Sequence, residues 1–231
     1  MKGFCRFLLD CIFPRECVSC GDLAGGRLVC SRCAGRIRSA AGAGRLPGPA
    51  VTPVISPFLT CDVLLDMIRF LKFEGGSAAA GWLGRRMSEA LEPHVRRLGD
   101  PVLVPVPLHW TRLARRGYDQ ARLLASEVSR NTGIPLKGRA LVRSRMTRPQ
   151  SVLDRDARRG NIDGAFRLRR AGDLKGKDVV LVDDLVTTGE TALACRRTLE
   201  AAGPSSFAVL CAGRKSAEKI KVERSEGLMF E

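Results

Sequence analysis

Residues 179–191 read VVLVDDLVTTGET. Four consecutive apolar residues, three of them β-branched, precede two carboxylates, and small hydroxyl and glycine residues follow. A continuous Val/Leu run is typical of a parallel strand covered on both faces, and ligands of open α/β sheets bind at the carboxyl ends of such strands. We therefore expect a buried strand that ends at Asp183 and Asp184, a loop over residues 185–189, and a helix that starts near Glu190.

The expected loop has the features of an anion site. Its backbone N–H groups and the positive end of the following helix favour a phosphate. Thr187 and Thr188 add hydroxyl donors. The two carboxylates suit a neighbouring polyol, a bound Mg²⁺, or both. The pattern therefore predicts a site for a sugar phosphate.

This stretch resembles the signature of the type I phosphoribosyltransferases. The resemblance implies that the acids contact the ribose hydroxyls of phosphoribosyl pyrophosphate, that Mg²⁺ is bound with this substrate, and that the loop cradles its 5′-phosphate. The residues assigned in this way are Asp183, Asp184, Leu185, Val186, Thr187, Thr188, Gly189, Glu190 and Thr191. One alternative is an ordinary core strand capped by acids. Another is the receiver domain of response regulators, which has its paired acids near its start, whereas only about 40 residues follow the motif here.

The composition is that of a folded protein with a basic surface. The chain has 231 residues, 45% of them hydrophobic, which suffices for one α/β domain and a small appendage. Its net charge of +15 is concentrated in residues 111–170, which carry 16 basic and 5 acidic side chains. Most of these basic residues are Arg, which binds phosphate oxygens in a bidentate way. A polyanionic partner and a solvated, Arg-biased surface both explain this charge.

Residues 1–14 are predicted to form a short amphipathic helix. Apolar residues recur there at helical spacing, while Arg6 and Asp10 interrupt the run and no small-residue cleavage site follows. We therefore expect no signal peptide. No apolar stretch approaches membrane-spanning length, so we expect a cytoplasmic protein without a transmembrane segment.

Residues 15–39 contain two C-x-x-C pairs, separated by nine residues. Each pair can hold one cation in a tight turn, and together they complete a tetrahedral site of four thiolates. Disulfides are the alternative, but a reducing cytoplasm disfavours them. We therefore predict a closed, structural zinc site, with ligands Cys17, Cys20, Cys30 and Cys33.

Residues 40–53 are rich in Ala, Gly and Pro and are predicted to be a linker to an α/β domain over residues 54–214, which a charged tail, residues 215–231, follows. Within that domain, residues 71–76 read LKFEGG. Glycine allows close approach of the backbone to a ligand, and a neighbouring lysine can meet an anion there. The segment resembles the pyrophosphate loop of type I transferases, which implies roles for Lys72 and Gly75. A simple turn at a helix end is the alternative.

Two further blocks narrow the resemblance. Residues 105–125 read PVPLHWTRLARRGYDQARLLA, and residues 147–166 read TRPQSVLDRDARRGNIDGAF. Together with the four cysteines, these blocks resemble the ComF family, phosphoribosyltransferase-like proteins associated with bacterial competence and DNA uptake. The family commonly has Phe-Asn where this chain has Tyr118-Asp119. The first block follows a short apolar strand, so Arg115 and Arg116 are expected at the ligand-binding edge, with Asp119 capping the next helix.

The resemblance implies a phosphoribosyltransferase-type α/β fold, a mainly parallel sheet flanked by helices, with a small amino-terminal zinc knuckle. It implies a protein that binds phosphoribosyl pyrophosphate with Mg²⁺ and handles incoming single-stranded DNA with the DNA-uptake machinery. The alternative is an active phosphoribosyltransferase of nucleotide or purine metabolism with no DNA role, whose acceptor the sequence does not identify. The charged segment 144–159 either closes over the reaction centre or sits on DNA phosphates.

Overall fold

The structure is a computed structural model that describes residues 16–40, 42–46, 52–73, 76–144, 164–169 and 171–216. The predicted amphipathic helix, Gly75, most of the charged tail and the segment 145–163 lie outside these residues.

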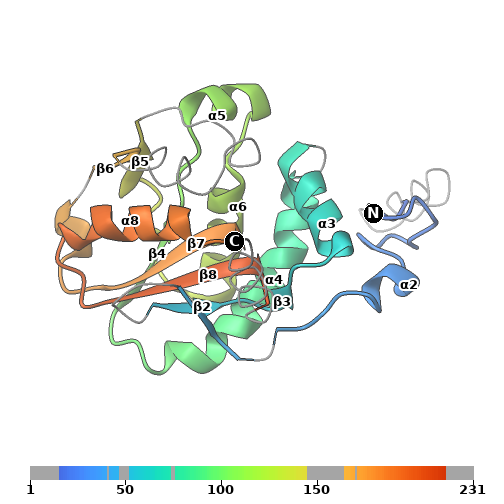
Figure 1. Cartoon of the computed structure of the whole chain (residues 1–231), viewed down its shortest axis with the longest axis horizontal. Coiled ribbons are helices and arrows are strands. Elements are labelled where there is room, and N and C mark those ends of the chain that lie inside the picture. The colour runs from blue at the N-terminus through green and yellow to red at the C-terminus, as the bar shows by residue number, and fades with distance from the viewer. Residues whose placement is uncertain are drawn as a thin grey trace, which may run out of the picture.

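The described chain forms one main sheet in the strand order β1-β2-β8-β7-β4, with β3 also paired to β8 (Figure 1). All neighbouring strands are parallel except β1, which runs antiparallel to β2. This confirms the predicted mainly parallel α/β class. The strands are β1 (Gly44–Arg45), β2 (Pro53–Ile55), β3 (Phe58–Leu59), β4 (Pro101–Pro105), β7 (Asp178–Val186) and β8 (Ser206–Arg214).

Helices cover both faces of this sheet (Figure 1). Helix α8 and the small antiparallel pair β5–β6 lie over one face, and α3, α4 and α6 pack on the other. Their bounds are α2 (Ser31–Ala34), α3 (Asp62–Phe73), α4 (Gly76–Val95), α5 (Trp110–Arg116), α6 (Gln120–Thr132), β5 (Leu141–Arg143), β6 (Phe166–Leu168), η2 (Ala171–Leu174) and α8 (Glu190–Glu200). Among the helices described, none has the length and apolar character needed to cross a membrane.

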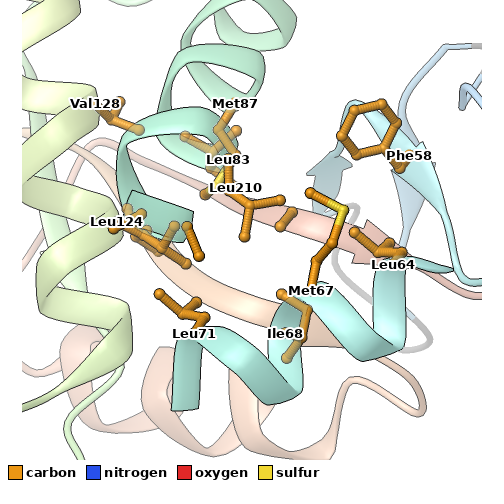
Figure 2. Close-up of a cluster of buried hydrophobic side chains, with 14 of the residues drawn as sticks. Phe58, Leu64, Met67, Ile68, Leu71, Leu83, Met87, Leu124, Val128 and Leu210 are labelled. Atoms are coloured by element: carbon orange, nitrogen blue, oxygen red, sulfur yellow. The ribbon is translucent and has the colours of Figure 1, made fainter. Parts of the chain in front are cut away.

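The core on the α3 side also anchors the cysteine-rich segment. Side chains of α3, α4, α6 and β8 interdigitate there, and Figure 2 shows Met67, Leu83 and Leu210 converging. Helix α3 contributes a full apolar face, namely Val63, Leu64, Met67, Ile68 and Leu71. Cys17, Cys30 and Cys33 belong to the same buried cluster. The amino-terminal module therefore packs against the α/β domain and continues its core.

Two segments differ from the sequence prediction. Gly44 and Arg45, inside the predicted linker, form strand β1 at the edge of the sheet. Strand β7 does not end at the acids but continues through Leu185 and Val186, which pair with residues 213 and 214 of the equally long β8. The loop before α8 is therefore limited to residues 187–189.

Candidate functional site

The acid pair lies near the carboxyl end of β7, one of the two long central strands. Successive residues of a strand point to opposite faces, so Asp184 leans toward α3 and Asp183 toward α8. The two acids still form one unit, because the backbone N–H of Asp184 donates to Asp183 Oδ1 at 2.8 Å. The charge of Lys72 also acts on both carboxylates.

Lys72 reaches the acid pair from the carboxyl end of α3. Its Nζ lies 2.8 Å from Asp184 Oδ2, and the two side chains are 26% and 9% exposed. The lysine and the aspartate are far apart in sequence and were assigned to different parts of one ligand. The fold brings them into direct contact at the carboxyl edge of the sheet.

Burial dominates the electrostatics of Asp183. Desolvation, followed by repulsion from Asp184, raises the pKa of Asp183 from 3.8 to about 8, against the lowering effects of the Asp184 N–H and of Lys72. Burial therefore favours the protonated form of Asp183 relative to an exposed carboxyl group. A cation bound to the pair would oppose this shift.

The predicted arginines occupy the last turn of α5, but their environments differ. Arg115 is exposed to solvent. Arg116 is partly buried, with its guanidinium 4.7 Å from the Phe73 ring centroid and its Nη1 3.2 Å from Gln120 Oε1. Burial, together with Arg112 and Arg115, lowers the pKa of Arg116, while the charge of Asp184 raises it. Of these two arginines, Arg116 is therefore the one whose charge interacts with the acid pair.

The loop over residues 187–189 ends at Gly189, which is the N-cap of α8 and has φ of 80°. A φ in this range favours glycine, and a glycine cap has no side chain to bond the first N–H groups of the helix. Thr187 is exposed, and Thr188 is partly exposed beside it. Leu185 and Val186 instead pack their side chains into the two cores, so only their backbone can face a ligand.

Three residues near the site carry contacts that the sequence prediction missed or only outlined. Tyr118 Oη donates to the backbone carbonyl oxygen of Leu71 at 2.7 Å. Arg143, on β5, is mostly buried over the Phe166 ring and its charge interacts with Asp183. Asp119 caps α6 as predicted, and it also accepts the N–H of Leu108 at 2.9 Å. No local pattern in the sequence signals the contacts of Tyr118 or Arg143, because both depend on partners distant in the chain.

The four cysteines of the amino-terminal module converge on one point. Their sulfur atoms all lie within 4.8 Å of one another, and the Sγ atoms of Cys20 and Cys30 are 3.7 Å apart. Tetrahedral zinc with bonds of about 2.3 Å to sulfur places its ligands about 3.8 Å apart, whereas disulfide-bonded sulfurs are about 2.0 Å apart. The cluster is therefore compatible with the predicted zinc site.

Local backbone hydrogen bonds shape the cysteine cluster. Each C-x-x-C pair is a tight turn, in which Gly21 N–H donates to Cys17 O at 2.9 Å and Ala34 N–H donates to Cys30 O at 2.9 Å. Burial raises the pKa of Cys17, but backbone N–H groups of Cys30, Ser19 and Cys20 outweigh it and lower the pKa to about 6. A thiolate at this position suits a metal ligand.

Comparison with known proteins identifies the family of this chain. Residues 113–227 match the family described as phosphoribosyl transferase domain. The DNA utilization protein YhgH of Salmonella typhi is 31% identical over 215 residues, 90% of this chain and 89% of that protein. YhgH of Escherichia coli K12 is 36% identical over 154 residues, 64% of this chain and 66% of the relative, so that match spans just under two thirds of its length. Competence protein F of Haemophilus influenzae is 38% identical over 104 residues, 45% of each chain. The chain therefore belongs to the ComF family of phosphoribosyltransferase-like proteins.

Proposed function

We propose that the carboxyl edge of the sheet binds phosphoribosyl pyrophosphate together with Mg²⁺. Asp183 and Asp184 hold the ribose hydroxyls, and the backbone and hydroxyl groups of residues 185–191 hold the 5′-phosphate. Lys72 and Arg116 bind the pyrophosphate, with Gly75 and the exposed Arg115 as further candidates in the same segments.

The observation that carries this proposal is the ion pair between Lys72 and Asp184. A site for a sugar diphosphate needs a cation for the pyrophosphate within one ligand's length of the acids that hold the sugar. Lys72 and Asp184 satisfy this requirement, although they belong to separate sequence motifs. Gly189 adds a helix N-terminus at the end of the same strand, where a phosphate is favoured.

The residues present also fit Mg²⁺ and the expected chemistry. Two neighbouring carboxylates offer the hard oxygen ligands that this cation prefers, and a bound Mg²⁺ would offset the charge of the pyrophosphate. As pyrophosphate leaves, positive charge develops on the ribose ring, and the fixed acids stabilise that charge. Lys72 and Arg116 stabilise the opposite charge on the departing group.

The test is a calorimetric titration with phosphoribosyl pyrophosphate in Mg²⁺. We expect Asp183→Asn with Asp184→Asn to weaken binding by more than about tenfold, because hydrogen bonds to charged groups contribute roughly 1.5–3 kcal/mol each. Asp100→Asn is the matched control, since Asp100 is an exposed acid at the amino end of β4. Undiminished binding by the double variant would show that the site is assigned wrongly.

We also propose that Cys17, Cys20, Cys30 and Cys33 bind a structural zinc ion. The spacing of their sulfur atoms supports this, and four thiolates leave no open position for a substrate. Ser19 Oγ, within the first cysteine pair, donates to Asp66 Oδ2 of α3 at 2.8 Å. The metal would therefore order a module that rests on the helix carrying Lys72.

The second candidate function is the handling of single-stranded DNA, by analogy with the names of the relatives. One observation favours it: Trp110 is 68% exposed on α5, beside Leu113 at 41%. Arg112, Arg115 and Arg116 follow on the same short helix. An exposed aromatic ring next to arginines suits stacking of bases with contacts to phosphates. Arg158 and Arg159 belong to the charged segment 144–159, whose contact with DNA the sequence left open, and lie outside the described residues.

Binding of a fluorescent oligodeoxythymidylate tests this second function. We expect Trp110→Ala to weaken binding by about 1–3 kcal/mol, the usual value of one stacked base. Affinity should fall as salt rises, and Arg115→Gln should reduce the slope by roughly 0.7, the value for one phosphate contact. Arg130→Gln, an exposed arginine of α6, is the control. Insensitivity to both salt and Trp110→Ala would leave the alternative of a transferase without a DNA role, which a screen of nucleobases for pyrophosphate release examines directly.

A further inference from the structure

We propose that Tyr118 is a positioning residue for the pyrophosphate subsite: its hydroxyl fixes the carboxyl end of α3 and thereby holds Lys72 in place. This inference rests on the proposed binding of phosphoribosyl pyrophosphate and adds to it a residue for which the sequence predicts no contact with the ligand. Tyr118 itself does not touch the sugar diphosphate in this scheme.

The first contact is a hydrogen bond to the last turn of α3. Tyr118 Oη donates to Leu71 O at 2.7 Å, and Leu71 directly precedes Lys72. This carbonyl is among the last four of α3, the part of a helix whose carbonyl groups lack partners in the regular helical pattern. A tyrosine from the turn between α5 and α6 therefore donates to a carbonyl group in the last turn of α3.

Two further contacts bracket Lys72 on its other side. A Cβ on Gly76 would lie 2.8 Å from Cζ of Tyr118, so the phenol ring packs directly on the backbone at the start of α4. The Arg116 guanidinium lies 4.7 Å from the Phe73 ring centroid. Residues 71, 73 and 76 are thus all held by the segment 116–118. A Cβ at position 76 would force the Tyr118 ring to move.

The contacts of segment 116–118 with residues 71, 73 and 76 matter because the lysine side chain is flexible. A lysine side chain has about 2 kcal/mol of rotamer entropy, so its ammonium is well placed only if its backbone is fixed. Lys72 Nζ lies 2.8 Å from Asp184 Oδ2 while Tyr118 holds the preceding carbonyl. The same turn carries Arg116. Lys72 and Arg116, the two cations proposed for the pyrophosphate, therefore lie on segments that contact each other, although 44 positions separate them in the sequence.

The variant Tyr118→Phe tests the role of the hydroxyl, since it keeps the ring against Gly76 and removes only the oxygen. We expect it to weaken binding of phosphoribosyl pyrophosphate in Mg²⁺ by roughly three- to tenfold, the range for one hydrogen bond. Binding of ribose 5-phosphate, which lacks the pyrophosphate, should change less than twofold. The control is Ser129→Ala, which removes an equivalent bond of 2.7 Å from a hydroxyl to the carbonyl oxygen of Ile134. It should alter binding of neither ligand.

A spectroscopic measurement reports directly on the surroundings of the Tyr118 ring. The chain contains a single tyrosine, so incorporation of 3-fluorotyrosine gives one ¹⁹F resonance, from position 118. We expect this resonance to shift when inorganic pyrophosphate and Mg²⁺ are added to the full chain. Gly76→Ala, which presses on the ring from the other side, should shift the resonance and weaken the diphosphate selectively.

The outcomes separate the two proposals. If wild-type protein binds neither sugar phosphate, the proposed function is wrong and this inference falls with it. If both ligands bind and Tyr118→Phe weakens them equally, or weakens neither, the proposed function stands and the positioning role is wrong. Selective loss of the diphosphate, with a melting temperature lowered by no more than in Ser129→Ala, supports the positioning role.

Discussion

The cysteine cluster and the acid pair are built in opposite ways. The four cysteines lie within 17 consecutive residues, and two local turns bring their sulfur atoms together. The acid pair instead meets a lysine from α3 and an arginine from α5, so it depends on three distant segments and on the sheet between them. A local site can be inferred from residue spacing alone. A site assembled by the fold can be inferred only in parts.

Helix α3 connects the two regions. Ser19, within the cysteine module, donates to Asp66 on this helix, and Lys72 lies at its carboxyl end. The lysine end has its own anchors, Tyr118 and Asp184. We therefore expect the cysteine module and the acid pair to fail separately, and the following variants test that expectation.

The largest effect is expected from loss of the metal ligands. Cys33→Ser should abolish zinc binding and unfold the module locally, because structural zinc contributes roughly 10–16 kcal/mol to small modules of this kind. Hydrogen exchange should accelerate over residues 17–33, while residues 179–186 stay protected. Metal analysis by mass spectrometry and exchange measurements on the same sample check both statements.

The control for this variant is Cys61→Ser, which changes a half-buried cysteine outside the cluster and should retain one zinc per chain. Binding of phosphoribosyl pyrophosphate by Cys33→Ser should change by less than about threefold, since Lys72 keeps its own anchors. A loss of ligand binding in parallel with zinc would mean that the regions are one cooperative unit.

The second effect concerns the pair on which the acid site depends. Lys72→Met leaves the buried Asp184 without its cation and should lower the free energy of unfolding by about 1–3 kcal/mol, as well as abolish diphosphate binding. Adding Asp184→Asn to this variant should restore most of the stability and none of the binding. Chemical denaturation and calorimetry measure the two quantities. Lys177→Met, which breaks an exposed pair with Asp100, should change stability by less than about 1 kcal/mol.

Some features of the fold and of the site were predictable from the sequence alone, and others were not. The C-x-x-C spacing predicted the convergence of the cysteine sulfurs, because that geometry needs only local turns. The apolar run before Asp183 predicted a buried strand but placed its end two residues early, since the length of β7 follows from its pairing with β8. The bond from Tyr118 to Leu71 spans 47 positions and has no local signature. Both the misplaced end of β7 and the missed contact of Tyr118 therefore depend on interactions between residues far apart in the sequence.

The third test compares the two ends of β7 through pH. Burial raises the pKa of Asp183 to about 8, so its protonated form is favoured in the folded state. The stability that it contributes is complete below its unfolded pKa near 3.9 and is lost as pH rises through 8. The melting temperature of Asp183→Asn should therefore rise relative to wild type between about pH 4 and pH 8 and level off above that range.

Asp178, at the amino end of the same strand, supplies the opposite sign. Its hydrogen bond from Ser206, together with the N–H groups of Asp100 and Gly99, lowers the pKa of Asp178 against the effect of burial. That stability is present above the unfolded pKa and is lost as pH falls. Asp178→Asn should therefore melt below wild type at neutral pH, with the difference shrinking in acid. Parallel curves for the two variants would contradict the assignment of Asp183 to a desolvated site.

The smallest effect on ligand affinity is expected at the edge of the site, on α5. Two neighbouring arginines there differ in whether they interact with the acid pair. Arg116 is partly buried against Phe73 and experiences the charge of Asp184, whereas Arg115 is exposed. Arg115→Gln should change the affinity for phosphoribosyl pyrophosphate by less than about twofold. Solvent and salt screen the attraction between an exposed arginine and the ligand, so this attraction contributes little. Arg116→Gln should weaken it by roughly tenfold, as expected for a partly desolvated contact to a charged group. Titrations at two salt concentrations distinguish the cases, since screening should erase the effect of Arg115 and leave most of that of Arg116. Equal losses from both variants would mean that the pyrophosphate subsite is open to solvent and less specifically assembled than the cysteine cluster.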